Sequence, residues 1–320
     1  MGLKKYFIIV ILAVAAYHFI GSSYNFHYSD DPIENIVYSK ITMDEIEKLK
    51  PLANQLRGKD DYETVWNIIF WQEDNIRYDY SKLYNNHYVQ SPTETLQLKR
   101  GVCIDYAILT ACLLLAMDKD AYIFVVDGYR NTPGHAFAGT SINDMPYALD
   151  EVAPITDVNS NIKRMTKEYP NLNLSTMRVY HLYIFDGKLY INKMNWYYVD
   201  ASRALTPEQK KEIEEAIINH LSKKYGLIPS SKINNMENMR YLPYRFREGV
   251  YYYVPFDGNL YVEFKEQYGR WIDRVLSGHV PLSFRNKVDT KPVNFNEWKY
   301  IWVKVDDKGG RGMIYIYLAK

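Results

Sequence analysis

Hydrophobic residues cover almost every face of the segment 103–117, a pattern that predicts a helix buried in the core. Only Asp105 and Thr110 are clearly polar within this segment. A Gly-Val-Cys turn precedes the segment and places Cys103 in the first turn of the predicted helix. We therefore expect the rest of the chain to be organised around this helix.

Two more helices are expected before this segment. Capping patterns at 42–45 and 60–63 mark their starts, because a side chain at each first position can accept a backbone hydrogen bond. The first helix is predicted to stop before Pro51, since proline breaks helical hydrogen bonding. The second carries apolar residues at helical spacing between 66 and 76, which indicates a core-facing side. Residues 21–38 are interpreted as a polar, aromatic spacer.

Strand patterns follow the buried helix. Apolar runs bounded by Gly and Pro predict strands at 121–126, 134–138 and 146–150. Two or three further strands are expected between 178 and 200, with a tight hairpin at Asp186-Gly187. This order predicts an α+β fold in which the buried helix packs on an antiparallel sheet.

The last third of the chain is predicted to begin with a helix and to continue mostly as strands. Thr206 and Gly226 are residue types typical of helix N-terminal and C-terminal caps, so we expect a helix between them. The later segments with strand patterns are 249–256, 259–264, 297–305 and 312–320. They predict a β-rich accessory region.

The composition is that of a folded protein without an electrostatic basis for binding nucleic acid. The chain has 320 residues, a formal net charge of +1 and 47% hydrophobic residues. Its basic residues are interspersed with acidic ones, which leaves no basic patch. Tyrosine is frequent, with 31 residues, and suits half-buried sheet faces and interaction surfaces. Because no phosphate loop or metal-ligand spacing is found, we predict neither a cofactor nor a metal.

An uncharged run from Tyr6 to Ser29 follows Lys4 and Lys5. Its apolar part is just long enough to cross a hydrocarbon layer of roughly 30 Å, so a membrane anchor and a cleaved signal peptide both fit. We favour the anchor, because cleavage after Ala13-Val14-Ala15 would leave a short apolar region. The lysines would then stay in the cytoplasm. The predicted location is the cell membrane, single-pass, with the folded part outside the cytoplasm.

The two cysteines are expected to remain free thiols. Cys103 and Cys112 would lie roughly 13 Å apart along one helix, which is too far for a disulfide. At a helix start, unpaired N–H groups and the positive end of the helix dipole favour the thiolate, the nucleophilic form. Cys103 is therefore the candidate nucleophile, whereas Cys112 is interpreted as a small buried hydrophobic residue.

A candidate base and a candidate orienting acid lie on the predicted strands. A cysteine nucleophile needs an imidazole to share its proton and a third group to hold that imidazole. His135 and Asp150 stand on two strands that are expected to pair, which would bring both toward the helix start. Asp200 is a rival for the third position, because it also ends a strand pattern, but the spacing favours Asp150. The other histidines are interpreted as structural or solvated.

These residues fall in sequence blocks that resemble the core of the transglutaminase-like superfamily, over residues 60–155. The blocks are 66–71 running into 76–78, 91–96, 101–107, His135-Ala136, and 147–150. The resemblance implies a papain-like Cys-His-Asp site made of Cys103, His135 and Asp150, and an upstream side chain, Trp71 or Gln97, that assists at the oxyanion. One departure is Glu151, which stands where many members have proline.

The predicted activity is that of an exported, membrane-anchored cysteine enzyme that forms a thioester at Cys103 from a protein or peptide amide. Hydrolysis of the thioester gives a protease or amidase, which we favour. Attack by an amine gives a transglutaminase-type cross-linking enzyme, the first alternative. The second alternative is a catalytically inert extracytoplasmic module that binds its partner through the tyrosine-rich accessory region.

The predicted domain organisation has four parts. They are an anchor or signal over 1–24, a helical arm over 25–59, a catalytic core over 60–205, and a linking helix with the β-rich accessory region over 206–320.

Overall fold

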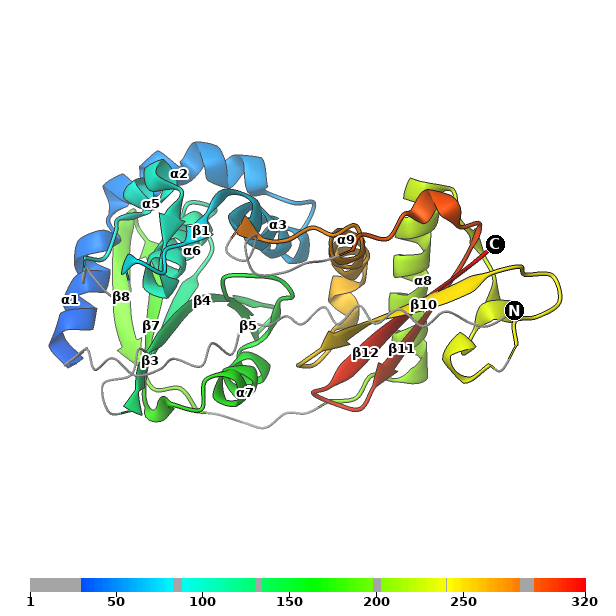
Figure 1. Ribbon diagram of the computed structural model, residues 1–320. Coiled ribbons are helices and arrows are strands. Elements are labelled where there is room, and N and C mark those ends of the chain that lie inside the picture. Colours follow the sequence, from blue (N-terminus) through cyan, green and yellow to red (C-terminus); the bar gives the residue numbers. More distant parts are fainter. Residues whose placement is uncertain (1–29, 83–87, 130–133, 198–202, 240, 283–290) are drawn as a thin grey trace. The chain divides into compact units, whose positions relative to one another are not determined.

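The computed structural model describes residues 30–82, 88–129, 134–197, 203–239, 241–282 and 291–320 (Figure 1). The predicted anchor over 1–24 and the rival acid Asp200 lie outside these residues. Among the helices within these ranges, none is long and apolar enough to cross a membrane.

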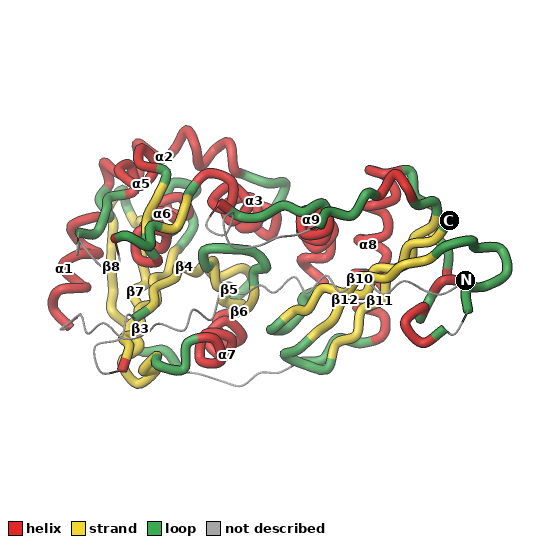
Figure 2. Tube along the Cα trace, in the orientation of Figure 1, coloured by secondary structure: helices red, strands yellow, loops and turns green. Residues whose placement is uncertain are grey.

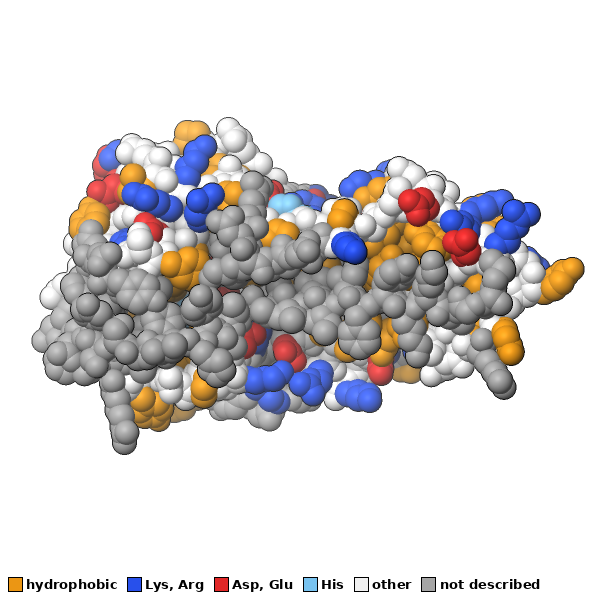
Figure 3. All heavy atoms as spheres, in the orientation of Figure 1, with side chains coloured by type: hydrophobic (Ala, Val, Ile, Leu, Met, Phe, Trp, Pro, Cys, Tyr) orange, Lys and Arg blue, Asp and Glu red, His pale blue; other side chains and the backbone are white. Residues whose placement is uncertain are grey.

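The described residues form two compact units, which are treated separately below. The first contains residues 30–197 with 281–282, and the second contains 203–280 with 291–320. Figure 2 shows that each unit gathers its longer strands into a sheet. On the face that Figure 3 shows, Lys and Arg side chains are interspersed with Asp and Glu.

A six-stranded antiparallel sheet forms the centre of the first unit. The strand order is β6-β5-β4-β3-β7-β8. The strands are β3 (Ala121–Gly128), β4 (His135–Ile142), β5 (Met145–Leu149), β6 (Thr156–Asp157), β7 (Leu172–Phe185) and β8 (Lys188–Met194). The three strands predicted after the buried helix are therefore found, and β4 pairs with β5 as expected. Asp186 and Gly187 form the predicted hairpin turn with φ angles of 49° and 66°.

Helices cover both faces of this sheet (Figure 1). They are α1 (Asp30–Lys40), α2 (Met43–Leu56), α3 (Asp61–Asn75), α5 (Pro92–Leu98), α6 (Cys103–Leu115) and α7 (Val158–Glu168). Helix α6 packs on β3 and β4, and every residue from Ile104 to Leu115 is buried, as its all-round apolar pattern predicted. On the opposite face, α7 closes a core that includes the stacked rings of Phe124 and Phe137.

Two expectations for the N-terminal arm are wrong. Helix α2 does not stop before Pro51 but continues to Leu56, because Ala53 and Leu56 are buried and their packing outweighs the lost hydrogen bond. The segment interpreted as a spacer contains α1, whose Tyr38 hydroxyl donates a hydrogen bond to the carbonyl of Ile191 at 2.6 Å. The predicted caps at Thr42 and Asp60 are both found.

The second unit is a mixed α/β unit. Its sheet has the strand order β10-β12-β11-β9, built from β9 (Ile228–Pro229), β10 (Gly249–Phe256), β11 (Tyr300–Asp307) and β12 (Gly312–Ala319). The unit also contains the helices α8 (Pro207–Tyr225) and α9 (Lys265–Leu276). Short 3-10 turns lie at 231–233, 236–238, 262–264 and 295–297. The predicted caps of α8 at Thr206 and Gly226 are found.

The β-rich expectation for this unit is wrong in one stretch. Residues 259–264 do not form a strand but lead into a 3-10 turn and then into α9. Helix α9 buries Tyr268, Trp271, Ile272 and Leu276 on one side. Aromatic residues by themselves favour strands. Here the apolar residues follow helical spacing, so the helix forms because it buries them together on one side.

Candidate active site

The start of helix α6 is held in place by neighbouring backbone. Val102 is its N-cap, and the N–H groups of Asp105 and Tyr106 donate to the Val102 carbonyl at 2.8 and 3.1 Å. Just before it, β2 (Arg100–Gly101) pairs in parallel with β1 (Arg77–Tyr78), which sets Tyr78 opposite Gly101. Cys103 is the first residue of the helix and is half-buried.

Asp105 ties this helix start to the preceding loop from a fully buried position. Its carboxylate accepts hydrogen bonds from the N–H groups of Val102 and Gln90, each at 2.8 Å, and an ion pair from the Lys82 ammonium. The side chain passes so close to Gly101 that a Cβ at position 101 would lie 2.8 Å from that of Asp105. The Gly-Val-Cys turn therefore needs glycine at its first position.

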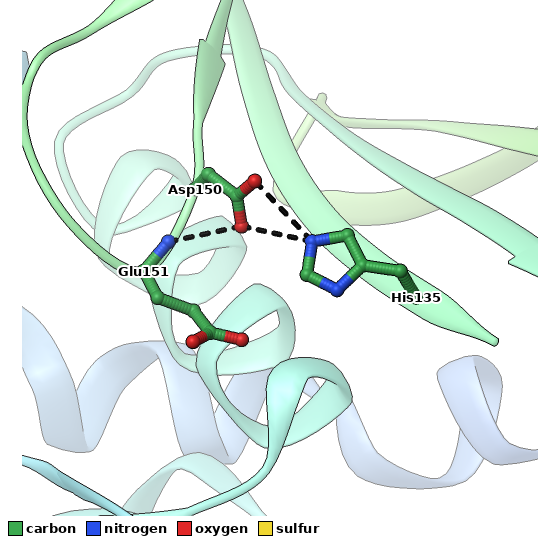
Figure 4. A group of neighbouring side chains, drawn as sticks. All are labelled: His135, Asp150 and Glu151. Carbon is green, nitrogen blue, oxygen red and sulfur yellow. Dashed lines mark hydrogen bonds and ion pairs between the residues drawn. The ribbon is translucent and has the colours of Figure 1, made fainter. Parts of the chain in front are cut away.

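His135 and Asp150 form a hydrogen-bonded pair (Figure 4). The Nε2 atom of His135 lies 3.0 and 3.2 Å from the two carboxylate oxygens of Asp150, and the two side chains are 12% and 11% exposed. Asp150 also accepts hydrogen bonds from the Glu151 N–H at 3.0 Å, from Asn161 at 3.3 Å and from Arg164 at 3.4 Å. The carboxylate is thus held from several sides.

The charges of this pair stabilise each other. Burial opposes the ionisation of Asp150, but the charge and hydrogen bond of His135, with help from Arg164, lower the pKa of Asp150 to about 2. Burial likewise opposes the charging of His135, yet Asp150 and then Cys103 hold the pKa of His135 well above its ordinary value. The protonated imidazole and the ionised carboxylate are therefore the favoured forms near neutral pH.

Cys103 completes the group, because its side chain lies close enough to His135 to help hold the pKa of that imidazole above its ordinary value. The structure thus places the three residues predicted from the sequence in one connected chain, Cys103 to His135 to Asp150. Cys112 is fully buried, and burial raises the pKa of its thiol. The rival Asp200 lies outside the described residues.

Other histidines show that an aspartate partner alone does not mark this kind of site. His181 lies 2.8 Å from Asp120, and His220 lies 3.2 Å from Asp273. Within the part of the chain that the structure describes, no hydrogen bond links either cysteine to these pairs. What distinguishes His135 is therefore its second contact, with the Cys103 side chain.

Two tyrosines lie next to Cys103 and His135. The sequence did not predict that they belong to the site. The Tyr78 side chain is hydrogen bonded to Cys103, and burial and the charges of Cys103 and Glu151 raise the pKa of Tyr78 well above its usual value. The Tyr169 ring stacks on His135 with centroids 5.9 Å apart. Tyr78 is the last residue of the first upstream block of the resemblance, 66–71 running into 76–78, and this is the signal that points to it.

The two residues proposed to assist at the oxyanion lie on neighbouring helices. Trp71 is half-buried on α3, and Gln97 is exposed on α5. No hydrogen bond links either side chain to Cys103 among the described residues. Their role stays a prediction.

One group of ligand-type side chains includes two residues of the site. His135, Asp150 and Glu151 each offer an atom, and these atoms lie within 4.8 Å of one another. His135 and Asp150 already satisfy each other through their hydrogen bond, so a metal ion would have to break that pair. The arrangement fits an acid-base pair better than a metal centre.

Residues 47–180 match a family model described as a transglutaminase-like domain. A UPF0252 protein of Pyrococcus furiosus is 28% identical over 206 residues, which cover 64% of this chain and 61% of that protein. A UPF0252 protein of Archaeoglobus fulgidus is 25% identical over 295 residues, covering 87% and 85%.

Among solved structures, calcium-bound LapG of Legionella pneumophila is 17% identical and covers 47% of this chain and 88% of its own, with a TM-score of 0.29. A similarity at this level carries no argument about the site. The match of residues 47–180 to this family model supports the transglutaminase-like superfamily that the sequence blocks predicted.

Proposed function

We propose that this protein is a cysteine hydrolase that cleaves a protein or peptide amide through a thioester at Cys103. The observation that carries the proposal is the connected chain from Cys103 through His135 to Asp150 at a helix start. This arrangement contains a nucleophile, a proton carrier and an orienting acid, which together suffice for acyl transfer.

In the first step, the Cys103 thiolate attacks the amide carbonyl and a C–S bond forms. The His135 imidazolium donates its proton to the nitrogen as the C–N bond breaks, and the amine leaves. In the second step, water attacks the thioester while the neutral imidazole takes its proton, and the C–S bond breaks to release the acid. The raised pKa of His135 supports its role as the proton donor of the first step.

The backbone supplies stabilisation for the negative oxygen that forms on the carbonyl. The N–H of Cys103 lies in the first turn of α6, where backbone N–H groups have no partner within the helix and the helix dipole is positive. A donor of this kind is typically worth about 3 kcal/mol of transition-state stabilisation. The Tyr78 hydroxyl beside Cys103 is a second candidate donor.

Mass spectrometry with an activated ester tests this function without knowledge of the natural substrate. The Cys103 thiolate should attack p-nitrophenyl acetate, release p-nitrophenol and carry one acetyl group. A Cys112→Ala variant should form the same adduct, whereas Cys103→Ala and His135→Ala should not. An acetyl group that appears equally in Cys103→Ala would refute the assignment.

Hydrolysis is proposed as the second step, with transfer to an amine as the alternative outcome. The rate at which the acetyl group leaves in buffer, compared with the rate in buffer with an added amine, separates them. Loss that is accelerated strongly by a millimolar amine, relative to water, would favour cross-linking.

The location outside the cytoplasm is a separate proposal. It rests on the uncharged run from Tyr6 to Ser29 after Lys4 and Lys5. Protease added to intact cells should digest the folded part. Digestion that requires lysis would contradict this orientation.

A further inference from the structure

Glu151 occupies the position directly after Asp150, at the end of β5. Its carboxyl lies within 4.8 Å of ligand-type atoms of both His135 and Asp150. Figure 4 shows the Glu151 side chain extending past Asp150 toward the imidazole. The carboxyl of Glu151 therefore lies beside the His135–Asp150 pair.

The Glu151 carboxyl has no fixed partner among the described residues. Its backbone N–H is bonded to Asp150, but no hydrogen bond or ion pair within those residues uses its carboxyl oxygens. Burial raises the pKa of Glu151 to about 8, against the opposing charges of His135 and Arg164. A carboxyl in this condition is stabilised in its ionised form by any cation that binds next to it.

Three tyrosine side chains lie close enough to this carboxyl to interact with its charge. Its charge acts on Tyr78, Tyr80 and Tyr169. Tyr78 and Tyr80 lie with ring centroids 4.8 Å apart, and Tyr80 is 38% exposed, so this side of the site reaches solvent. Aromatic faces next to a carboxylate are the combination that binds ammonium groups, because both present negative charge to the cation.

We infer that Glu151, together with Tyr78 and Tyr80, forms a subsite for an organic cation, of the lysine ammonium type, next to the reacting amide. This inference rests on the proposed function and names the substrate class of the same site. An anionic group is disfavoured at this place, because it would lie next to the ionised carboxylate of Asp150 and would oppose the ionisation of Glu151. Glu151 is then a specificity-determining residue of the reaction.

Charged thiol reagents test this subsite directly. In a Cys112→Ala background with EDTA, the Cys103 thiolate attacks a methanethiosulfonate, forms a mixed disulfide and releases methanesulfinate. The rate is compared for a trimethylammonium-ethyl reagent, a sulfonatoethyl reagent and the neutral methyl reagent. Because all three need the same thiolate, the ratio of the cationic to the anionic rate reports the charge around Cys103.

At about pH 9, above the raised pKa of Glu151, the cationic reagent should react faster, and Glu151→Gln should lower the cation-to-anion ratio by about tenfold, as expected for loss of one charge within a few ångströms in a partly buried site. Asp144→Asn is the matched control. It makes the same change at the exposed turn before β5, where the φ of 63° suits asparagine, and should leave the ratio unchanged.

The outcomes separate this inference from the proposed function. If the neutral reagent labels Cys103 but the ratio is the same in wild type and Glu151→Gln, the subsite is refuted while the nucleophile stands. If no reagent labels Cys103 faster than an ordinary small thiol, the proposed function and the subsite both fall.

A second comparison identifies which molecule carries the cation. Cys103 is first acetylated with p-nitrophenyl acetate, and the acetyl group is then released by pentylamine or by diaminopentane. Diaminopentane should release the acetyl group about twice as fast as pentylamine merely because it has two amines. If its advantage is larger than this and is lost in Glu151→Gln, the subsite binds the attacking amine. Equal release, with the charge preference kept in labelling, assigns it to a basic side chain of the cleaved substrate.

Discussion

Replacement of Asp105 by asparagine is predicted to destabilise the first unit strongly. Asp105 is fully buried and receives two backbone N–H groups and the Lys82 ammonium. An asparagine has one oxygen acceptor, so one of the two N–H groups would meet an NH₂ group instead. The change would also leave Lys82, which is nearly buried, without its counter-charge.

The size of the effect follows from these contacts. Breaking a buried ion pair by removing one partner typically costs about 3–5 kcal/mol, because the remaining charge stays buried. This is a large part of the roughly 5–15 kcal/mol by which domains are stable. With a urea slope of about 3 kcal/mol per M, the unfolding midpoint should fall by roughly 1–1.7 M.

Alkylation of Cys112 measures this unit specifically. In a Cys103→Ala background, Cys112 is the remaining thiol, and it is fully buried in α6, so it reacts when this unit unfolds. Brief exposure to an alkylating reagent at each urea concentration gives the midpoint. Asp144→Asn is again the matched control, and it should change the free energy of unfolding by less than about 0.5 kcal/mol.

A double variant tests the reason for the loss. Adding Lys82→Met to Asp105→Asn removes the stranded charge and should recover part of the stability. A midpoint for Asp105→Asn that matches wild type would refute the account of the helix start. A double variant no more stable than Asp105→Asn would refute the part assigned to Lys82.

Three further predictions concern the site. Cys103→Ala should abolish activity on any substrate found, while Cys112→Ala should keep it and cost about 1 kcal/mol of stability in urea unfolding; equal loss in both would contradict the roles. Asp150→Asn should lower turnover by roughly 10⁴-fold, as loss of an orienting carboxylate does in serine triads, and near-normal kinetics would exclude this role. Because the pKa of Glu151 is raised to about 8, the folded state keeps a proton that the unfolded chain releases. The free energy of unfolding should therefore decrease as the pH rises from about 4.5 to 8, and this decrease should be smaller in Glu151→Gln. If the two proteins lose stability equally over this range, the raised pKa of Glu151 is contradicted.

The features that could be predicted from the sequence depend on residues that lie close together in the chain. The buried helix followed from an apolar pattern within one segment, and the caps at Thr42, Asp60 and Thr206 followed from residues three positions apart. His135 and Asp150 could be paired because a single antiparallel return connects β4 and β5. The structure places these two side chains 3.0 Å apart.

The features that were missed depend on contacts between distant segments. Helix α2 passes through Pro51 because its later residues are buried by other elements, which no local pattern reports. Tyr78 reaches Cys103 through the pairing of β1 with β2. Glu151 was visible as a departure from the family pattern, but its interaction with Tyr78 and Tyr80, which lie more than 70 residues earlier in the sequence, depends on the folded chain.

The most direct test of the account is the pH dependence of Cys103 alkylation by iodoacetamide, in a Cys112→Ala background, with and without His135→Gln. In the proposed site, His135 takes the thiol proton and holds it near neutral pH, because the pKa of the imidazole is raised. Cys103 should therefore react rapidly already near pH 6, and His135→Gln should lower that rate at least about tenfold while leaving the rate near pH 10 similar. Identical profiles for the two proteins would contradict the central claim that Cys103 and His135 form a reactive pair.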